Sequence, residues 1–325
     1  MPVVRIAFLN CWNCFAVGQV DRALQNPPAL TKKIADLANT LSLAFGGEAP
    51  DVIGLCEIGR KSLARRVARL VAQADPAGPI TYDVAWSGSP SVDQPGIALC
   101  YRSDSVVAFG SPKVSPDPAV DPRRARWMAQ LFEFHRSGSR APAWLVVNHW
   151  KSRRGGIDLS EADRLGSAYD IGDFFLASAR LLCDSMIAIG DFNCEPGERP
   201  FDRQAVGSLA NAPPSNRLRA ARERDMVLRE KNRLAYLYCP MWRFMGEPHP
   251  AELASSPVPA TRLMGTYGAP VVGNKPGWLM FDQFLVTKRL LRGGALRFRE
   301  GSLRIVHPLA GCSDHCAIAA EFEIQ

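Results

Sequence analysis

Short apolar runs recur along the whole chain, and they constrain the fold more than any other feature of the sequence. Each run has the length of a β-strand and is rich in Val, Ile, Leu or Phe. The runs occupy residues 3–9, 51–56, 96–102, 128–134, 143–147, 186–190, 284–287, 303–306 and 317–324. This pattern predicts a chain whose core consists largely of β-sheet.

Helical periodicity separates some of these runs. Apolar residues at three- and four-residue steps predict helices over 30–45 and 63–71, and a further helix is expected over 160–183. Strands and helices therefore alternate early in the chain, whereas later strands follow one another closely. That mixture predicts an α/β fold of two packed β-sheets with helices on the outside.

The region from 201 to 264 interrupts this rhythm, because no convincing strand is visible in it. It contains Pro213-Pro214 and a charged stretch at 217–238 with helical character. We expect one domain over residues 1–325, with a helical insertion at about 201–264.

Composition and charge narrow the function classes. Lys+Arg 39 against Asp+Glu 32 gives a net charge of +7 over 325 residues, which favours a polyanionic partner such as nucleic acid. No apolar stretch approaches the roughly 18 residues of a membrane span. The N-terminus lacks the pattern of an export signal, so we expect a cytoplasmic protein that does not act in a membrane.

The chain has nine cysteines, most of them inside apolar runs. We expect small buried side chains in a reducing cytoplasm. Cys11 and Cys14 have a zinc-like spacing, but no second pair of Cys or His ligands follows them. A zinc site or a disulfide is therefore not expected there.

Polar side chains stand where several apolar runs end or begin. Oxygen ligands with few sulfur ligands suit Mg²⁺ or Mn²⁺, and histidines beside carboxylates suit acid–base chemistry. The residues are Asn10, Glu57, Asn148, His149, Asp191, Asn193, Asp314 and His315.

Each of these features taken alone has an ordinary structural interpretation. Glu57 can be a solvated loop carboxylate, and His149 a half-buried imidazole. Residues 190–193 can form a simple turn, and 313–315 can cap a local structure. Their order and their shared placement at strand ends favour a functional site.

The ordered set LNCWNCF, DVIGLCE, VVNHWKS, IAIGDFN, MFDQFLV and CSDHCAI resembles the endonuclease/exonuclease/phosphatase superfamily, which includes deoxyribonuclease I-like enzymes. The resemblance extends from residue 3 to residue 324. It implies a four-layer α/β sandwich, with two mixed β-sheets flanked by helices. It also implies divalent-metal-dependent cleavage of a phosphate ester.

The resemblance carries site residues over one by one. It implies that Asn10, Glu57 and Asp314 lie at a metal ion, Mg²⁺ or Mn²⁺. It implies catalytic roles for His149, Asp191, Asn193, Asp282 and His315.

Two positions depart from the family pattern. The first motif offers Asn13 as well as Asn10, and we choose Asn10 because it directly ends the apolar run. Gln283 follows Asp282 where many relatives carry Tyr or His.

The implied mechanism leaves one assignment open. Asp282 is expected to keep His315 in one tautomer, so that His315 can take a proton from the attacking water. Asp191 is the alternative base.

Substrate contacts are expected near the site and on basic segments. Asn148, Lys151, Arg153 and Arg154 are expected to contact substrate phosphate. Further arginines cluster at 123–126 and 217–233, where they can bind a phosphate backbone or form a solvated helix face. The tryptophans that can either stack on bases or be buried are Trp12, Trp150, Trp242 and Trp278.

Three functions follow as alternatives. The first is a metal-dependent nuclease acting on DNA or RNA, as an endonuclease or an exonuclease. The second is a phosphatase or phosphodiesterase acting on a small phosphorylated molecule or a lipid headgroup. The third is a catalytically inactive nucleic-acid-binding module on the same fold.

Overall fold

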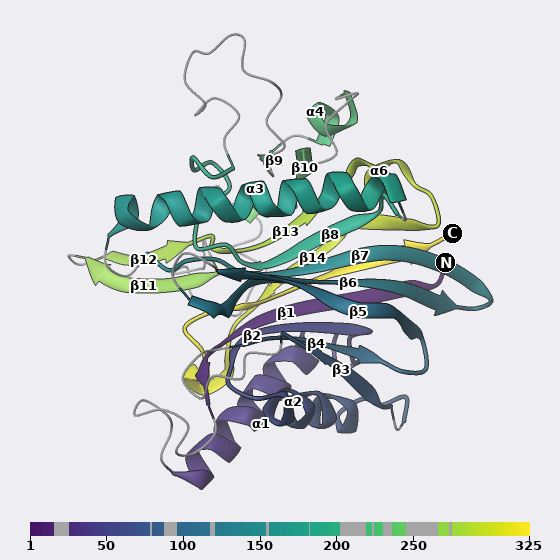
Figure 1. The fold of residues 1–325 in the computed structure, drawn as a ribbon. Helices are drawn as coiled ribbons and strands as arrows, with labels where there is room; N and C mark the ends of the chain where they lie inside the picture. The colour runs from purple at the N-terminus through teal and green to yellow at the C-terminus, as the bar shows by residue number, and fades with distance from the viewer. Residues whose placement is uncertain are drawn as a thin grey trace, which may run out of the picture.

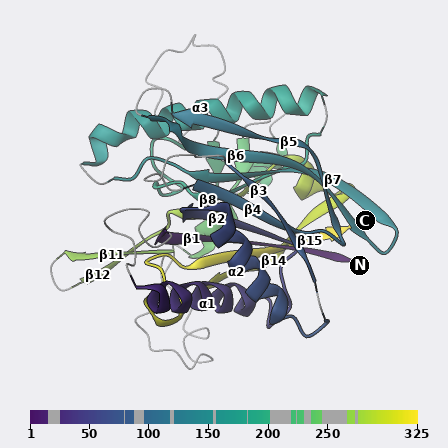
Figure 2. The same ribbon diagram turned by 60° about the horizontal axis from the view of Figure 1, so that its bottom comes forward.

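Two β-sheets pack face to face at the centre of the protein, and helices cover their outer faces (Figures 1 and 2). The structure is a computed structural model. It describes residues 1–15, 26–78, 80–87, 96–117, 121–153, 156–181, 183–201, 219–222, 224–229, 236–244, 266–272 and 275–325.

The helices and strands follow one another in this order: β1 (Val3–Cys14), α1 (Pro27–Leu43), β2 (Val52–Ile58), α2 (Lys61–Gln73), β3 (Tyr82–Trp86), β4 (Gly96–Arg102), β5 (Val106–Asp117), β6 (Asp121–Arg136), β7 (Ser139–His149), α3 (Ile157–Leu181), β8 (Met186–Asp191), β9 (Arg219–Ala221), α4 (Arg224–Arg229), β10 (Tyr236–Tyr238), η1 (Pro240–Phe244), β11 (Tyr267–Val272), β12 (Lys275–Leu279), β13 (Asp282–Val286), α6 (Lys288–Arg292), β14 (Leu296–Val306), η2 (Leu309–Gly311) and β15 (Ala317–Ile324).

Both large sheets are mixed. The six-stranded sheet has the order β14-β15-β1-β2-β4-β3, and the seven-stranded sheet has the order β5-β6-β7-β8-β13-β10-β9. Helices α1 and α2 cover the six-stranded sheet, and α3 covers the seven-stranded sheet (Figure 1). The expected four-layer α/β sandwich is therefore confirmed.

Strand β1 shows why the central strands form. Ile6 and Phe8 point into the core between the two sheets, whereas Ala7 and Leu9 point into the core under α1 and α2. Because side chains alternate across a strand, a strand covered on both faces is apolar at every position. The run IAFL at 6–9 satisfies this requirement, whereas Arg5 near the start of the strand is partly exposed and pairs with Glu48.

Each sheet contains a parallel pair that ends at the site. Strand β1 runs parallel to β2, with Asn10 opposite Cys56. Strand β7 runs parallel to β8, with His149 opposite Asp191. The carboxyl ends of a parallel pair meet at one edge of a sheet, so polar residues following such strands are gathered there.

Every expected strand and helix outside 201–264 is present, but the sequence pattern missed β3, β5, β11, β12 and the short helix α6. Strand β5 contains Gly110, Pro112 and Pro116, which weaken a strand pattern. It lies at the edge of the seven-stranded sheet, where proline is tolerated because one side of the strand is unpaired.

The expectation of no strand between 201 and 264 is wrong for the described part of that region. Strands β9 and β10 extend the seven-stranded sheet, and α4 is the helix among the described residues of the charged stretch. Three-residue strands are too short for a periodic signal, and pairing of β10 with β13 and of β9 with β10 decides their conformation. Residues 202–218 and 245–265 lie outside the described residues, so the single domain and its insertion stay predictions.

Among the described helices, none is both long enough and apolar enough to cross a membrane.

Candidate active site

Three predicted residues lie side by side across three strands of one sheet. The register places His149 of β7 opposite Asp191 of β8, and Asp191 opposite Asp282 of β13. Aligned residues on adjacent strands project from the same face. Gly190 precedes Asp191 with φ +135°, and a Cβ there would lie 2.3 Å from the carbonyl oxygen of Asn148. Only glycine therefore permits this approach of the two strands.

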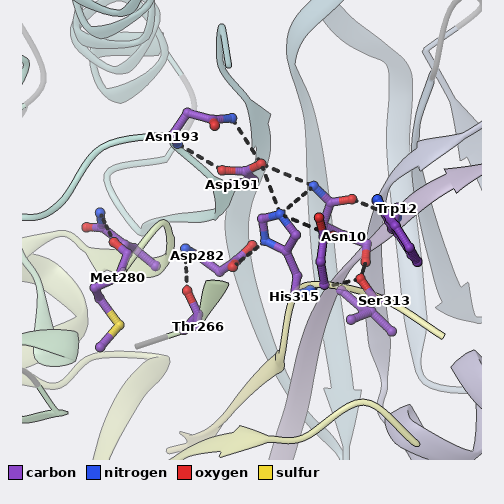
Figure 3. A network of polar contacts seen from close by, with 12 residues as sticks. Asn10, Trp12, Asp191, Asn193, Thr266, Met280, Asp282, Ser313 and His315 are labelled. Carbon is purple, nitrogen blue, oxygen red and sulfur yellow. Dashed lines mark hydrogen bonds and ion pairs between the residues drawn. The ribbon is translucent and has the colours of Figure 1, made fainter. Parts of the chain in front are cut away.

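His315 completes this row from a loop (Figure 3). Its Nδ1 lies 2.7 Å from Oδ2 of Asp282, inside hydrogen-bonding distance. The hydroxyl of Ser313 donates to the backbone oxygen of Asn10 at 2.7 Å and accepts the backbone N–H of His315 at 3.0 Å. Ser313 therefore joins the His315 loop to the end of β1.

Asn10 is fully buried, and its side chain contacts site residues from both sheets. Its Nδ2 lies 3.2 Å from Oε1 of Glu57, 3.1 Å from Oδ2 of Asp191 and 3.4 Å from Nε2 of His315. The backbone N–H of Asn13 donates to Oε2 of Glu57 at 2.9 Å. The structure thus brings the Asn10 side chain into the cluster, whereas Asn13 reaches Glu57 through its backbone.

Glu57 faces His149 from the opposite sheet, with 3.3 Å between Oε1 and Nε2. Burial alone would raise the pKa of Glu57. The hydrogen bond and charge of His149, followed by His315 and the amide of Asn10, outweigh it and lower the pKa to about 2. Glu57 is therefore an ionised carboxylate at neutral pH.

Asp191 and His315 shift each other's protonation. Burial raises the pKa of Asp191, and the positive charge of His315 opposes this rise. Burial would lower the pKa of His315, but the charge and hydrogen bond of Asp282, with Asp191 and Asp314, raise it to about 10. Without a bound cation, the proton therefore resides on the imidazole rather than on Asp191.

His315 Nε2 faces two further carboxylates without a hydrogen bond to either. It lies 3.9 Å from Oδ2 of Asp191 and 3.8 Å from Oδ1 of Asp314. These separations exceed hydrogen-bonding distance, so the two carboxylates act on the imidazole through their charge. Nδ2 of Asn10 contacts both Nε2 of His315 and Oδ2 of Asp191.

Asn193 fixes the carboxylate of Asp191. Its backbone N–H donates to Oδ1 at 2.8 Å, and its Nδ2 donates to Oδ2 at 3.0 Å and to the oxygen of Trp150 at 3.1 Å. Asn193 has φ 49°, so it adopts a left-handed conformation that is costly for a non-glycine residue. Its contacts orient Asp191.

The donor set suits a hard divalent cation. Ligand atoms of Glu57, His149 and Asp191 lie within 4.8 Å of one another, and so do those of Asp191, Asp282 and His315. Oδ1 of Asp314 is buried and has no hydrogen-bond partner among the described residues. Burying a carboxylate oxygen without a partner costs free energy, and a bound cation or a hydrogen-bond donor would offset that cost.

The residues expected to contact substrate phosphate divide into three groups. The expectation that Asn148 contacts substrate phosphate is corrected by its hydrogen bonds. Its amide donates to the oxygens of Val146 and Ile189, and its oxygen accepts the indole N–H of Trp150. Alternation along β7 turns it into the core, away from His149. Lys151 lies just beyond β7 and is partly exposed, and Arg154 lies outside the described residues.

Arg153 is already engaged by protein groups. Its Nε donates to the backbone oxygen of Asn193 at 2.9 Å, and its guanidinium pairs with Glu198. The guanidinium carbon lies 4.5 Å from the ring centroid of Phe281. These contacts argue against Arg153 as a substrate ligand.

The tryptophans and arginines expected to contact nucleic acid differ in how accessible they are. Trp150 is fully buried against Phe192 and Phe201, so it is unavailable for stacking. Trp12 is 41% exposed. Trp242 is partly buried, with Arg222 at 6.0 Å from its ring. The side chains of 123–124 and of Trp278 lie outside the described residues, as do residues 217 and 231–233.

Three further residues contribute to this site: Ser313, which the sequence suggested only as a local cap, and Thr266 and Tyr267, which it did not suggest. Ser313 stands two residues before His315, which is the spacing of a hydroxyl that accepts a nearby backbone N–H. Thr266 accepts the backbone N–H of Asp282 at 2.8 Å, and the ring of Tyr267 lies 4.8 Å from that of His315. Thr266 and Tyr267 carried no local signal, because only the fold brings them to β13 and His315.

Solved structures share this fold. TDP2 from C. elegans matches with a TM-score of 0.55 and 14% identity over 98% of this chain and 75% of that chain. D. rerio TDP2 complexed with single strand DNA product matches with a TM-score of 0.55 and 14% identity over 99% of both chains. The human Nocturnin catalytic domain with bound sulfate anion matches with a TM-score of 0.51 and 16% identity over 99% of this chain and 95% of that chain.

No curated protein matches the chain. Residues 26–246, more than half of the chain, match the family described as Endonuclease/Exonuclease/phosphatase. The match includes Glu57, His149, Asp191 and Asn193. The chain belongs to the endonuclease/exonuclease/phosphatase family, with the deoxyribonuclease I-like fold.

Proposed function

We propose that this protein is a Mg²⁺- or Mn²⁺-dependent nuclease that hydrolyses phosphodiester bonds in DNA or RNA. The carrying observation is the row of His149, Asp191 and Asp282 across three strands, with His315 hydrogen-bonded to Asp282. This row combines an oriented imidazole with buried carboxylates at one sheet edge, which is an acid–base arrangement.

The metal would be held by Glu57 and Asp314, whose buried Oδ1 has no partner among the described residues, with the amide of Asn10 close by. A divalent cation bound there neutralises the anionic phosphate and the charge that develops on its oxygens. The low pKa of Glu57 supports this, because an ionised carboxylate is available at neutral pH.

Two residues of the protein would then handle the protons of the reaction, one as base and one as hydrogen-bond donor. Asp191 takes the proton of the attacking water, since its carboxylate is held by three hydrogen bonds and its pKa is raised towards neutrality. His315 keeps its Nε2 proton directed at the reacting oxygens and stabilises their charge. His149 and Lys151 contact non-bridging oxygens.

Nucleic acid is the proposed substrate class for two reasons. The net charge of +7 favours a polyanion. A structure with this fold, D. rerio TDP2, is complexed with a single strand DNA product. The nine free thiols support a reducing, cytoplasmic setting.

The test is an activity panel with Mg²⁺, Mn²⁺ or a chelator, comparing wild type with His315→Ala. The panel holds linear, circular and abasic DNA, RNA, cyclic dinucleotides and phosphomonoesters. Metal-dependent cleavage of DNA or RNA that is lost in His315→Ala is expected. Cleavage of phosphomonoesters alone would indicate a phosphatase instead of a nuclease. Binding of nucleic acid without any turnover would indicate a catalytically inactive binding module.

A salt series separates the same alternatives by binding. With His315→Ala, affinity for nucleic acid should fall steeply as salt rises, because lysines and arginines displace condensed counterions. Lys151→Gln should reduce the slope by about one unit. A flat salt response without competition by DNA or RNA would contradict a nucleic-acid substrate.

A further inference from the structure

Trp12 is an exposed aromatic side chain at the edge of the candidate active site. Its side chain is 41% exposed, although it stands only two residues after the fully buried Asn10. Its backbone N–H donates to Oδ1 of Asn10 at 2.9 Å (Figure 3). The backbone of Trp12 is therefore held by Asn10, the residue that contacts Glu57, Asp191 and His315.

An irregularity in β1 turns this ring outward. The register of β1 against β2 is regular to Asn10 and shifts before Cys14. Trp12 has φ 47° and Asn13 has φ 54°, which are left-handed conformations that bulky residues rarely adopt. Bulges beside active sites commonly redirect a side chain in this way. The same bulge directs the N–H of Asn13 to Glu57.

Lys33 of α1 holds the ring in place and adds a positive charge. Its Nζ donates to the backbone oxygen of Trp12 at 2.6 Å and lies 5.0 Å from the ring centroid. An ammonium at this distance is attracted by the aromatic ring. An ammonium has three donors, and the hydrogen bond to Trp12 uses one of them.

We propose that Trp12 and Lys33 form a nucleobase-binding subsite beside the cleavage site. An unpaired base next to the scissile phosphate stacks on the exposed indole, and Lys33 contacts the phosphate of that nucleotide. Base–aromatic stacking tolerates any base, since every base has a flat π-face. In a duplex that face is covered by neighbouring bases, so the preferred substrate has unpaired nucleotides.

This inference rests on the proposed nuclease function and narrows its substrate class. A sugar phosphate or a lipid headgroup has no nucleobase to stack on Trp12, and the Lys33 ammonium beside the ring disfavours a cationic headgroup such as choline. A single-stranded oligonucleotide is recognised both through its base and through its phosphate.

The first experiment compares wild type, Trp12→Ala and Trp12→Phe on two single-stranded oligonucleotides. One is a normal strand, and the other has abasic residues around the cleavage position. Phe109→Ala is the matched control, because Phe109 is 48% exposed but lies on β5, away from Trp12. A thermal melt confirms that each variant is folded.

Trp12→Ala should raise KM on the normal strand by roughly tenfold or more, the size expected for one lost base stack. It should change KM on the abasic strand little, and Trp12→Phe should retain most of the wild-type value. An unchanged KM for Trp12→Ala, or an equal loss on both strands, would overturn the subsite.

A second measurement does not depend on turnover. Binding of a dithymidine 5′-phosphate in chelator should quench protein fluorescence in wild type, and the quenching should be lost in Trp12→Phe. Equal quenching in both proteins would overturn the subsite even if the nuclease function holds. If no variant cleaves nucleic acid, the proposed function fails while this assay still decides whether Trp12 binds a base.

Discussion

Arg153 donates from Nε to the backbone carbonyl oxygen of Asn193 at 2.9 Å. Its guanidinium also pairs with Glu198, whose carboxylate accepts the backbone N–H of Glu195 at 3.3 Å. These contacts fasten the turn that holds Asn193 in its left-handed conformation. Arg153 thus influences the position of Asp191 indirectly, because it holds Asn193, which hydrogen-bonds to Asp191.

Arg153→Lys and Glu198→Gln should each lower kcat by about ten- to a hundredfold, because a small displacement of an oriented catalytic group is costly. KM for nucleic acid and its salt dependence should stay close to wild type. Steady-state kinetics at several salt concentrations measure both quantities. The double variant should lose little more than either single variant, because both changes break one unit.

A phosphate-binding Arg153 would behave differently. Removing Glu198 would then free the guanidinium and tighten substrate binding, which would contradict the positioning interpretation. Arg199→Gln is the control, because the Arg199 guanidinium forms an ion pair with Glu161 at 3.6 Å and leaves the Asn193 turn intact.

His315→Ala and Asp191→Ala should each reduce turnover by roughly a thousandfold or more, since both remove central acid–base or transition-state groups. Circular dichroism should show a folded protein in both cases, because Asp191 lies at the end of β8 and His315 in a loop, outside the apolar core. Near-normal turnover in either variant would move the site elsewhere.

The His315–Asp282 pair should make stability depend on pH. The folded protein raises the pKa of His315 from 6.5 to about 10, so this pair stabilises the fold fully below pH 6.5. That stabilisation is lost as pH rises towards about 10. Urea unfolding in chelator should show wild type losing stability over this range.

Asp282→Asn should lose much less over the same range, because it removes the main cause of the raised pKa of His315. His135→Gln, which removes an imidazole on β6, is the control and should keep the wild-type slope. Parallel pH profiles for wild type and Asp282→Asn would count against this pairing in solution.

Glu57→Gln should raise the metal concentration for half-maximal activity by at least about tenfold, because it removes a ligand charge while keeping the shape. Metal titration of activity measures this. KM for substrate at saturating metal should change less. Glu48→Gln, which alters an exposed carboxylate paired with Arg5, should titrate like wild type. Superimposable curves for wild type and Glu57→Gln would exclude Glu57 as a ligand.

The sequence by itself determined the central strands and the residues that end them. The apolar runs 6–9 and 186–190 form the centre of β1 and most of β8, because burial on both faces requires apolar side chains throughout. The polar residues after them, Asn10 and Asp191, reach the site because the central parallel strands end together. These features are local in the chain, so a local pattern was sufficient.

Tertiary structure alone decided what each polar group contacts. Asn148 and His149 are neighbours in sequence, but the pleat of β7 sends one into the core and the other to Glu57. The sequence predicted Arg153 as a phosphate ligand, but in the fold its guanidinium pairs with Glu198. Strand pairing, register and ion pairs join residues far apart in the chain, and the free energy of each contact exists only once both partners are in place.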